Sequence, residues 1–415
     1  MLQIDHVYDF FKTNIFKQIQ TYSLSNGIYP TSIEFDRCIF NIFSKTGSTS
    51  KIMFIDQEPI LKEFVIPSVK FFKFPDPNNY SVESYIEDFY KDRLPYSDVE
   101  FQWDLIRENP KRLFKEPVAL CVSEKSEFLN ELCAKENLKI LYYFFHGFAA
   151  IDWYRGFYAL NYNKSVVQEY EKDFVSFNRI VTNDRSYRCY FVSMLVSYKL
   201  IDNGQISFGI ASDCDSWQSE MANQKTKLSS KAINHIEKYL PTVKTPLVVD
   251  QSTVSGYASA DIPRVINDSF WHIVTETVFY YEKLHLTEKI FKPIVMKQPF
   301  MLLAAPGNLE YLRSYGFKTF DGIIDESYDH IQDPDLRIEA VVKQLDWYCR
   351  LSPDEKRQIM IKIEPIVEYN FHHFYGEFKN IIANELLGNC QQLFKEIGYD
   401  DSTIAYEDIY KTLVN

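Results

Sequence analysis

The chain of 415 residues is 46% hydrophobic and 16% aromatic, so it is long enough for two domains and too apolar to be disordered. Its formal net charge of −12 argues against general binding to nucleic acid, which depends on neutralising phosphates, although a local basic cleft would suffice for DNA. No apolar run reaches the ~18 residues of a membrane span and the first residues lack a signal-peptide pattern, so we expect a cytoplasmic protein with no membrane span.

The first half of the chain has the pattern of a parallel α/β unit. Residues 51–55 and 117–122 are predicted strands, and Ser123 is predicted to cap the helix that follows the second. The apolar run 138–145 is predicted as a central strand that stops at His146. Strand, helix and strand in this order favour parallel pairing.

The same pattern starts again after about residue 170. Further strands are predicted at 177–182, 206–210, 270–275, 299–304 and 318–324. Helices are predicted at 188–200, 226–240, 288–297 and 308–315, the last ending at Gly316. The tail from Asp333 to Asn415 is predicted to be mainly helical, with one face formed by Leu336, Ile338, Val341 and Leu345. Pro293 is expected to kink its helix or to delay its start, because proline removes a backbone hydrogen bond.

This order predicts two doubly wound α/β domains that face each other across a cleft, followed by a helical tail. We place the first domain at residues 1–170, the second at 171–370 and the helical segment at 371–415. In such sheets, ligands bind outside the carboxyl ends of the strands. The candidate site residues all lie at such an end or at the start of the next helix.

Glycine and cysteine usage argues against several kinds of site. Glycine is scarce, at 13 residues, and neither G-x-G-x-x-G nor G-x-x-x-x-G-K-[ST] occurs, which weakens the dinucleotide-dehydrogenase and P-loop interpretations. The seven cysteines are scattered and include no C-x-x-C pair. The sequence therefore indicates neither a zinc site nor a disulfide framework.

The most informative stretch begins with the predicted strand 270–275, which ends in the carboxylate of Glu276. The helix start that follows carries Glu288 and Lys289 behind Thr287, a predicted N-cap. A helix N-terminus attracts phosphate, and the lysine adds a point charge. The two glutamates are expected to accept hydrogen bonds from ribose or sugar hydroxyls. The stretch therefore predicts a site for a sugar that carries a diphosphate.

Two arginines near the first strand of the second half are further candidates for the diphosphate. Arg179 lies in the predicted strand 177–182, and Arg188 is expected near the start of the next helix, where its planar fork suits phosphate oxygens. The alternative is an arginine on a solvated helix face. If Arg188 and Lys289 grip one pyrophosphate, they must not lie far apart, and they must not both turn toward bulk solvent on a convex face.

The first half offers candidates for a general base. Asp56 and Glu58 follow a predicted strand and are placed to accept the proton of an acceptor hydroxyl. The alternative for both is an acid on a surface turn. His146, on the acceptor side, is a second candidate, and its alternative is a structural hydrogen-bonding role.

The segment from Phe270 to Ile294 resembles the donor-binding motif of the α-1,3-fucosyltransferase group of GT-B glycosyltransferases. In that group a strand ends in a glutamate, and Tyr-(Val/Leu)-Thr-Glu-Lys follows. Here the match is Glu276 and then His285-Leu-Thr-Glu-Lys, with His285 in place of the tyrosine. Arg188 matches the phosphate-binding arginine of the family, and Glu58-Pro is similar to the turn that supplies its base.

A longer stretch, roughly residues 50–330, resembles uncharacterised glycosyltransferases of bacteriophage genomes. The motifs that carry this likeness include Asp56-Gln-Glu-Pro, Tyr142-Tyr-Phe-Phe-His-Gly, Asp152-Trp-Tyr-Arg, Phe177-Asn-Arg and Thr287-Glu-Lys-Ile-Phe-Lys-Pro-Ile. The fucosyltransferase likeness, which lies mostly in the second half of the chain, implies a GT-B fold, a nucleotide-diphosphate sugar as donor substrate, inversion of stereochemistry, and neither an essential metal nor another cofactor.

On this interpretation the second domain binds the nucleotide sugar and the first binds the acceptor. The acceptor is a glycan, a small molecule, or a hydroxymethylated pyrimidine of phage DNA, which would demand a flipped base and a basic groove. A non-catalytic nucleotide-binding or glycan-binding module is an alternative. Another is a metal-dependent single-domain transferase, because Asp213 and Asp215 form an Asp-x-Asp pattern after a predicted strand. A solvated loop would explain the same two residues.

Overall fold

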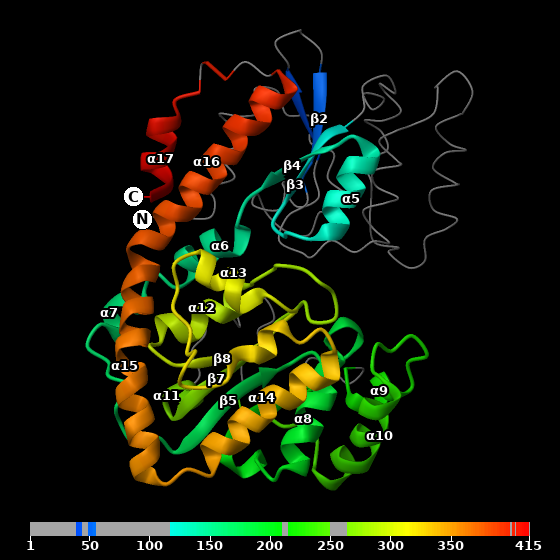
Figure 1. The fold of residues 1–415 in the computed structure, drawn as a ribbon, viewed down its shortest axis with the longest axis vertical. Coiled ribbons are helices and arrows are strands. Elements are labelled where there is room, and N and C mark those ends of the chain that lie inside the picture. The colour runs from blue at the N-terminus through cyan, green and yellow to red at the C-terminus, as the bar shows by residue number, and fades with distance from the viewer. Residues whose placement is uncertain are drawn as a thin grey trace. The chain divides into compact units, whose positions relative to one another are not determined.

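The computed structural model divides the chain into two compact units (Figure 1). Unit 1 is Met1–Asp152 with Lys379–Asn415, and unit 2 is Trp153–Phe378. The residues that the structure describes are 39–43, 49–54, 117–209, 215–249, 264–398, 401–402 and 404–414. Within those ranges, every helix falls short of the length and apolarity that a membrane crossing requires.

Unit 1 contains a sheet with the strand order β1-β2-β3-β4, in which β1 and β2 are antiparallel and the other pairs are parallel. Its strands are β1 (Ile39–Phe43), β2 (Thr49–Phe54), β3 (Pro117–Val122) and β4 (Lys139–Tyr142). The described helices that belong wholly or mainly to this unit are α5 (Glu127–Glu136), α6 (Phe145–Trp153), α16 (Glu377–Ile397) and α17 (Tyr406–Val414). The strands predicted at 51–55 and 117–122 are therefore confirmed.

Two predictions in unit 1 are wrong in detail. The apolar run 138–145 is not one strand, because β4 ends at Tyr142 and helix α6 begins at Phe145. A continuous apolar run carries no periodicity that separates a buried strand from a buried helix. The cap of α5 is Ser126 and not Ser123, since the Ser126 hydroxyl accepts from the Leu129 backbone N–H at 3.3 Å.

Unit 2 is built on a wholly parallel sheet with the order β6-β5-β7-β8. Its strands are β5 (Lys172–Asn178), β6 (Gly204–Phe208), β7 (Ser269–Thr275) and β8 (Phe300–Leu303). All residues of β7 and β8 are buried, so both faces of these strands are covered. The predicted α/β class with parallel pairing is confirmed, whereas the GT-B arrangement of two domains around a cleft stays a prediction.

The helices of unit 2 fall into two packing groups, in which α8 contacts α10 and α14, and α12 contacts α7 and α15. The first group is α8 (Tyr187–Ser197), α10 (Ser230–Tyr239) and α14 (Pro334–Cys349). The second is α7 (Phe157–Asn161), α12 (Glu288–Val295) and α15 (Pro353–Tyr375). Shorter helices are α9 (Trp217–Met221), α11 (Arg264–Asn267) and α13 (Asn308–Ser314). Gly316 follows α13 with φ +89°, which confirms the predicted end of that helix.

Helix α12 starts where its cap predicts and not where its proline would delay it. The Thr287 hydroxyl accepts from the Lys289 backbone N–H at 3.3 Å, and the helix begins at Glu288. The expected later start is therefore wrong. Pro293 lies in the last turn of a helix that ends at Val295, so it interrupts only one intrahelical bond.

The strand predicted at 318–324 is also wrong. This segment curls around Glu326, whose carboxylate accepts from the Phe320 backbone N–H at 2.7 Å and from the Thr319 hydroxyl at 2.6 Å. A single bridge between Asp321 and Ile324 is its only β-type pairing.

Leu336 is the one misplaced member of the predicted apolar face of α14, because it is exposed while the other three are buried.

Candidate functional site

The carboxyl ends of β5 and β7 form the topological switch point of the unit 2 sheet. The chain leaves β5 toward β6 on one side and later returns to β7 on the other side of β5. Ligands of open parallel sheets bind outside the strand ends at such a point. The residues that follow β5 and β7 are therefore the first place to search for a site.

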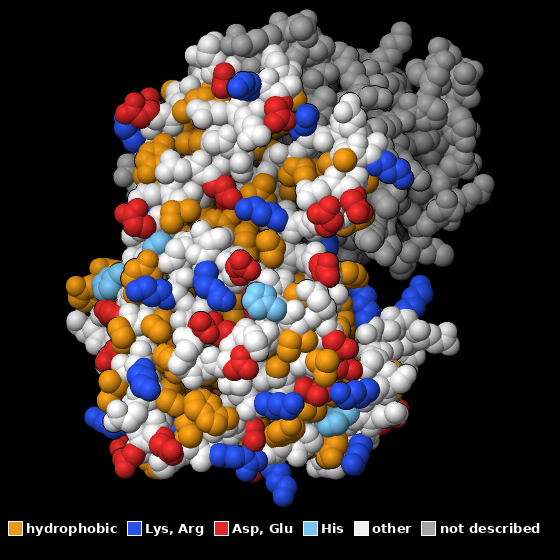
Figure 2. Space-filling model, in the orientation of Figure 1, with side chains coloured by type: hydrophobic (Ala, Val, Ile, Leu, Met, Phe, Trp, Pro, Cys, Tyr) orange, Lys and Arg blue, Asp and Glu red, His pale blue; other side chains and the backbone are white. Residues whose placement is uncertain are grey.

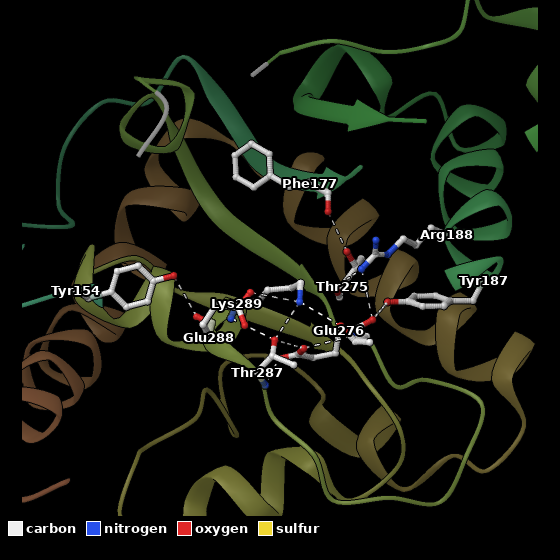
Figure 3. A network of polar contacts seen from close by, with 10 residues as sticks. Tyr154, Phe177, Tyr187, Arg188, Thr275, Glu276, Thr287, Glu288 and Lys289 are labelled. Atoms are coloured by element: carbon white, nitrogen blue, oxygen red, sulfur yellow. Dashed lines mark hydrogen bonds and ion pairs between the residues drawn. The ribbon is translucent and has the colours of Figure 1, made fainter. Parts of the chain in front are cut away.

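Arg188, in the first turn of α8, spans this switch point (Figure 3). Its Nη1 donates to the carbonyl of Ile180 beyond β5 at 2.8 Å, and its Nη2 donates to the carbonyl of Thr275 at the end of β7 at 2.7 Å. A longer bond of 3.5 Å joins Nη2 to the carbonyl of Glu276. Arg188 as a residue is only 3% exposed, so it is not the solvated helix-face arginine of the alternative interpretation.

The charge of Arg188 is not paired with a carboxylate anywhere in the described part of the chain, since all its hydrogen bonds go to main-chain carbonyls. Its Nε is buried and has no partner there. A buried cation is costly unless a counter-charge and hydrogen bonds compensate it. The switch point therefore carries a buried positive charge that is hydrogen-bonded to main-chain carbonyls, with its Nε donor to spare.

Glu276 lies directly after β7 and is fully buried. Its Oε2 accepts from the Thr287 hydroxyl at 2.6 Å and from the Thr277 backbone N–H at 3.3 Å. Its Oε1 accepts from the Thr287 backbone N–H at 3.1 Å. The carboxylate thus fastens the end of β7 to the N-cap of α12.

Lys289 stands in the first turn of α12 with its side chain 36% exposed. Its Nζ donates to the hydroxyls of Thr287 at 3.1 Å and Thr277 at 3.2 Å, and the carboxylate of Glu288 lies 3.5 Å away. The ammonium is therefore held mainly by neutral acceptors at the positive end of a helix. This combination suits the binding of an anion.

Aromatic and cationic side chains stack behind the loop that follows β7. The Tyr187 and Phe279 rings are parallel with centroids 3.9 Å apart, and the Arg337 guanidinium lies 4.3 Å from the Phe279 centroid. The Tyr187 hydroxyl donates to the carbonyl of Glu276 at 2.6 Å. Burial raises the pKa of Tyr187, so its phenol stays a donor at neutral pH.

The loop after β7 is also hydrogen-bonded to the segment that follows β8 and to the start of α13. The Ala305 backbone N–H donates to the carbonyl of Val278 at 3.1 Å. Asn308 accepts from the His285 backbone N–H at 3.0 Å and donates to the carbonyl of Lys283 at 2.8 Å. His285, which replaces the tyrosine of the fucosyltransferase motif, is buried.

Tyr154 supports the start of α12 from another direction. Its hydroxyl donates to the carbonyl of Glu288 at 3.3 Å, and its own carbonyl accepts from the Tyr375 hydroxyl at 2.7 Å. Burial, followed by the negative charges of Glu288 and Glu276, raises the pKa of Tyr154 well above its usual range. The phenol therefore remains protonated and holds the first turn of α12.

Five of the predicted donor-binding residues are gathered in one polar network, namely Arg188, Glu276, Thr287, Glu288 and Lys289 (Figure 3). Arg179 is half-buried just after β5, outside this network. His146 is buried in the first turn of α6, so it does not end a strand as predicted. Asp56, Glu58 and Asp213 lie outside the described residues.

The Asp215 carboxylate is held by hydrogen bonds from within the protein. Its carboxylate accepts from the Val181 backbone N–H at 3.0 and 3.2 Å and from the Thr182 hydroxyl at 2.8 Å. These bonds fasten the loop after β6 to the loop after β5. Within the described ranges, no three or more His, Cys, Asp or Glu side chains are grouped so that they could hold a metal ion.

Sequence reasoning missed Thr277, Tyr187 and Tyr154. Thr277 follows Glu276 directly, and Tyr187 precedes Arg188, so the rule that strand ends carry ligand groups could have found both. Tyr154 is distant in sequence from α12, and no local pattern links the two. Only the folded chain places its phenol there.

The face of the molecule in Figure 2 bears on a nucleic-acid partner. On that face the described Lys and Arg side chains are interspersed with Asp and Glu side chains, without a continuous basic stripe. A duplex backbone is usually met by clustered basic residues.

Comparison of the chain with protein-family models, curated proteins and solved structures gave no match, so the site is interpreted from its residues alone.

Proposed function

We propose that this protein is a glycosyltransferase that moves a sugar from a nucleotide-diphosphate sugar to a hydroxyl acceptor. One observation carries the proposal. The buried guanidinium of Arg188, which meets no carboxylate among the described residues, stands at the switch point, and one polar network links it to Lys289 on the start of α12. A pyrophosphate supplies the counter-charge that such a pair of cations requires.

In the proposed complex, the diphosphate faces Lys289 and the first turn of α12, and Arg188 contributes its charge from the ends of β5 and β7. Glu288, half-buried beside Lys289, is the carboxylate best placed to accept a hydrogen bond from a sugar or ribose hydroxyl. The site thus offers cations for the phosphates and an acceptor for hydroxyls.

The proposed reaction breaks the bond between the sugar anomeric carbon and the diphosphate oxygen. The cations of unit 2 stabilise the negative charge that collects on the leaving diphosphate. The acceptor hydroxyl oxygen forms the new bond from the opposite face, which inverts the anomeric centre. Its proton passes to a general base, for which Glu58 and then Asp56 are the candidates.

The first test is binding. Nucleoside diphosphates with different bases are screened by thermal shift, since a ligand at a hundred times its dissociation constant should stabilise the fold by about 2.7 kcal/mol. Lys289→Met should abolish most of the stabilisation, while Lys343→Met, which changes an exposed lysine of α14, should leave it intact.

The second test is turnover with the nucleotide sugar that binds best. Acceptors in the panel are glycans, small-molecule alcohols and DNA that contains hydroxymethylated pyrimidines. Release of the nucleoside diphosphate with a glycosylated product of inverted anomeric configuration is the expected result. Absence of binding to every diphosphate would refute the donor site, and binding without transfer or donor hydrolysis would indicate the non-catalytic module.

A further inference from the structure

The Thr287 hydroxyl lies between a carboxylate and an ammonium, and its proton can serve only one of them. A hydroxyl has one proton to donate and two lone pairs that accept. An ionised carboxylate only accepts, so the 2.6 Å contact with Glu276 Oε2 takes the proton. The lone pairs are then turned to Lys289, whose backbone N–H lies at 3.3 Å and whose Nζ lies at 3.1 Å.

The Glu276 carboxylate is already occupied by the protein. Three donors reach it, from Thr287 twice and from the Thr277 backbone once, out of about four lone-pair positions. The residue is also 0% exposed. A sugar hydroxyl would have to displace one of these bonds, so the direct sugar contact expected from the sequence is poorly served by this geometry.

The Lys289 ammonium, in contrast, is oriented without being fully neutralised. Two of its three donors go to the hydroxyls of Thr287 and Thr277, and Glu288 lies at 3.5 Å, longer than a good charge-assisted hydrogen bond. With about a third of its side chain exposed, the lysine remains within reach of a ligand.

We propose that Glu276 is a positioning residue and not a sugar ligand. It sets the direction of the Thr287 hydroxyl, and that hydroxyl, together with Thr277, holds the Lys289 ammonium toward the ligand. The identity of the anion as a nucleoside diphosphate rests on the proposed function, whereas the relay from Glu276 through Thr287 to Lys289 does not.

The relay is tested without any nucleotide by the acylation rate of Lys289, followed by peptide mass spectrometry. Glu276→Gln keeps the shape but replaces one carboxylate oxygen by an amide NH₂. With that NH₂ in the place of Oε2, the Thr287 hydroxyl turns its proton toward Lys289 and loses an acceptor there, whereas in the place of Oε1 it faces the Thr287 backbone N–H. Glu276→Leu removes both oxygens and leaves the Thr287 hydroxyl without its acceptor in either case. The Lys289 labelling rate should rise several-fold. Glu282→Gln, an exposed change in the same loop, should leave it unaltered. An unchanged Lys289 rate in both Glu276→Gln and Glu276→Leu would overturn the relay.

Three further variants keep the test decisive if Glu276→Gln folds poorly. Thr277→Val removes one acceptor of the ammonium and leaves the Glu276–Thr287 bonds in place, so it should raise the Lys289 rate as well. Thr287→Ser retains the hydroxyl and should restore the protected rate that Thr287→Val loses. Equal rates in Thr287→Ser and Thr287→Val would contradict the relay.

Affinity for the best nucleoside diphosphate separates positioning from plain electrostatics. Removal of a carboxylate near an anion should strengthen binding if only charge matters, whereas loss of positioning should weaken it by about tenfold, the scale of a hydrogen bond to a charged group. In a Lys289→Met background, Glu276→Gln should then cost nothing more. A full tenfold loss in that background would assign Glu276 a contact of its own. If no diphosphate binds, the proposed function fails while the labelling result still judges the relay.

Discussion

The Nη2 atom of Arg188 donates to the main-chain carbonyl of Thr275 at 2.7 Å, which joins the first turn of α8 to the last residue of β7. The two residues are 87 positions apart in the chain. A second bond to the carbonyl of Ile180 makes the guanidinium a bridge between the strands that flank the switch point. The same side chain thereby has a structural role and brings a charge to the proposed donor site.

Replacement of Arg188 by methionine should destabilise the fold even without ligand. It leaves the buried carbonyl of Thr275 without its donor, at about 1–3 kcal/mol, and the half-buried carbonyl of Ile180 as well, at a smaller cost. Urea denaturation measures this free energy of unfolding. Arg357→Met, at an exposed position of α15, should change it by no more than about 0.5 kcal/mol. Equal midpoints for the two variants would show that the bridge carries no stability.

The general base should affect turnover and spare binding. If Glu58 takes the acceptor proton, Glu58→Gln should lower the transfer rate by about 10²–10⁴-fold, the usual contribution of a positioned base. Its affinity for the nucleoside diphosphate should stay at the wild-type value in the same preparation. Asp56→Asn is the matched variant, and a larger loss there than in Glu58→Gln would transfer the role to Asp56.

A chelator should leave sugar transfer unaffected if the reaction is metal-independent. Initial rates with and without EDTA test this directly. Loss of activity with EDTA that added Mn²⁺ or Mg²⁺ restores would support the metal-dependent alternative.

Asp215→Asn should lower thermal stability because Asp215 accepts hydrogen bonds from the Val181 backbone N–H and the Thr182 hydroxyl.

His272 should make the fold sensitive to acid. Burial, followed by the positive charge of Lys292, lowers the pKa of His272 from 6.5 to about 3. The unfolded chain binds the proton near pH 6.5 and the folded chain only near pH 3, so stability is lost as the pH falls between these values. The slope should approach ~1.4 kcal/mol per pH unit.

The variant His272→Asn is the control for this pH dependence. Its side-chain amide can still donate to Gln298, whose Oε1 lies 3.2 Å from the His272 Nδ1. Urea titrations at several pH values between about 4 and 6.5 should show a shallower pH dependence for the variant, by close to one proton. Parallel curves for the two proteins would mean that His272 is not buried in its neutral form.

Two glycines with positive φ separate backbone strain from steric clash. At Gly322 (φ +79°) an added Cβ meets nothing within 4 Å, so Gly322→Ala should cost only the left-handed backbone penalty of about 1–2 kcal/mol. At Gly316 (φ +89°) the added Cβ would lie 2.7 Å from His373 Cε1. Gly316→Ala should therefore destabilise by about 1–3 kcal/mol more in chemical denaturation. A smaller loss of stability in Gly316→Ala than in Gly322→Ala would contradict the close approach of His373.

Local patterns predicted most elements of unit 2. The buried strand β7, the Thr287 cap and the end of α13 at Gly316 each follow from a few adjacent residues. Failures came where the local residue types fit more than one structure. The segment 318–324 has strand-like residues but folds around the carboxylate of Glu326, and Phe145 continues an apolar run but starts a helix.

The candidate site shows the same division. Its members were predictable because strand ends and helix starts of a parallel sheet meet at one edge. Their roles were not, because a role depends on which partner each atom finds. Glu276 was expected to meet a sugar, and its carboxylate instead meets Thr287 and the Thr277 backbone. Periodicity and spacing do not encode such pairings.

The bonds that fasten the loop after β7 also bear on the thermodynamics of ligand binding. Tyr187, Asn308 and Ala305 each fix a point of its backbone. A loop that is already ordered gives up little conformational entropy when a ligand arrives, so more of the contact energy appears as affinity. We therefore expect this wall of the site to be preorganised, with slow amide exchange in the ligand-free protein.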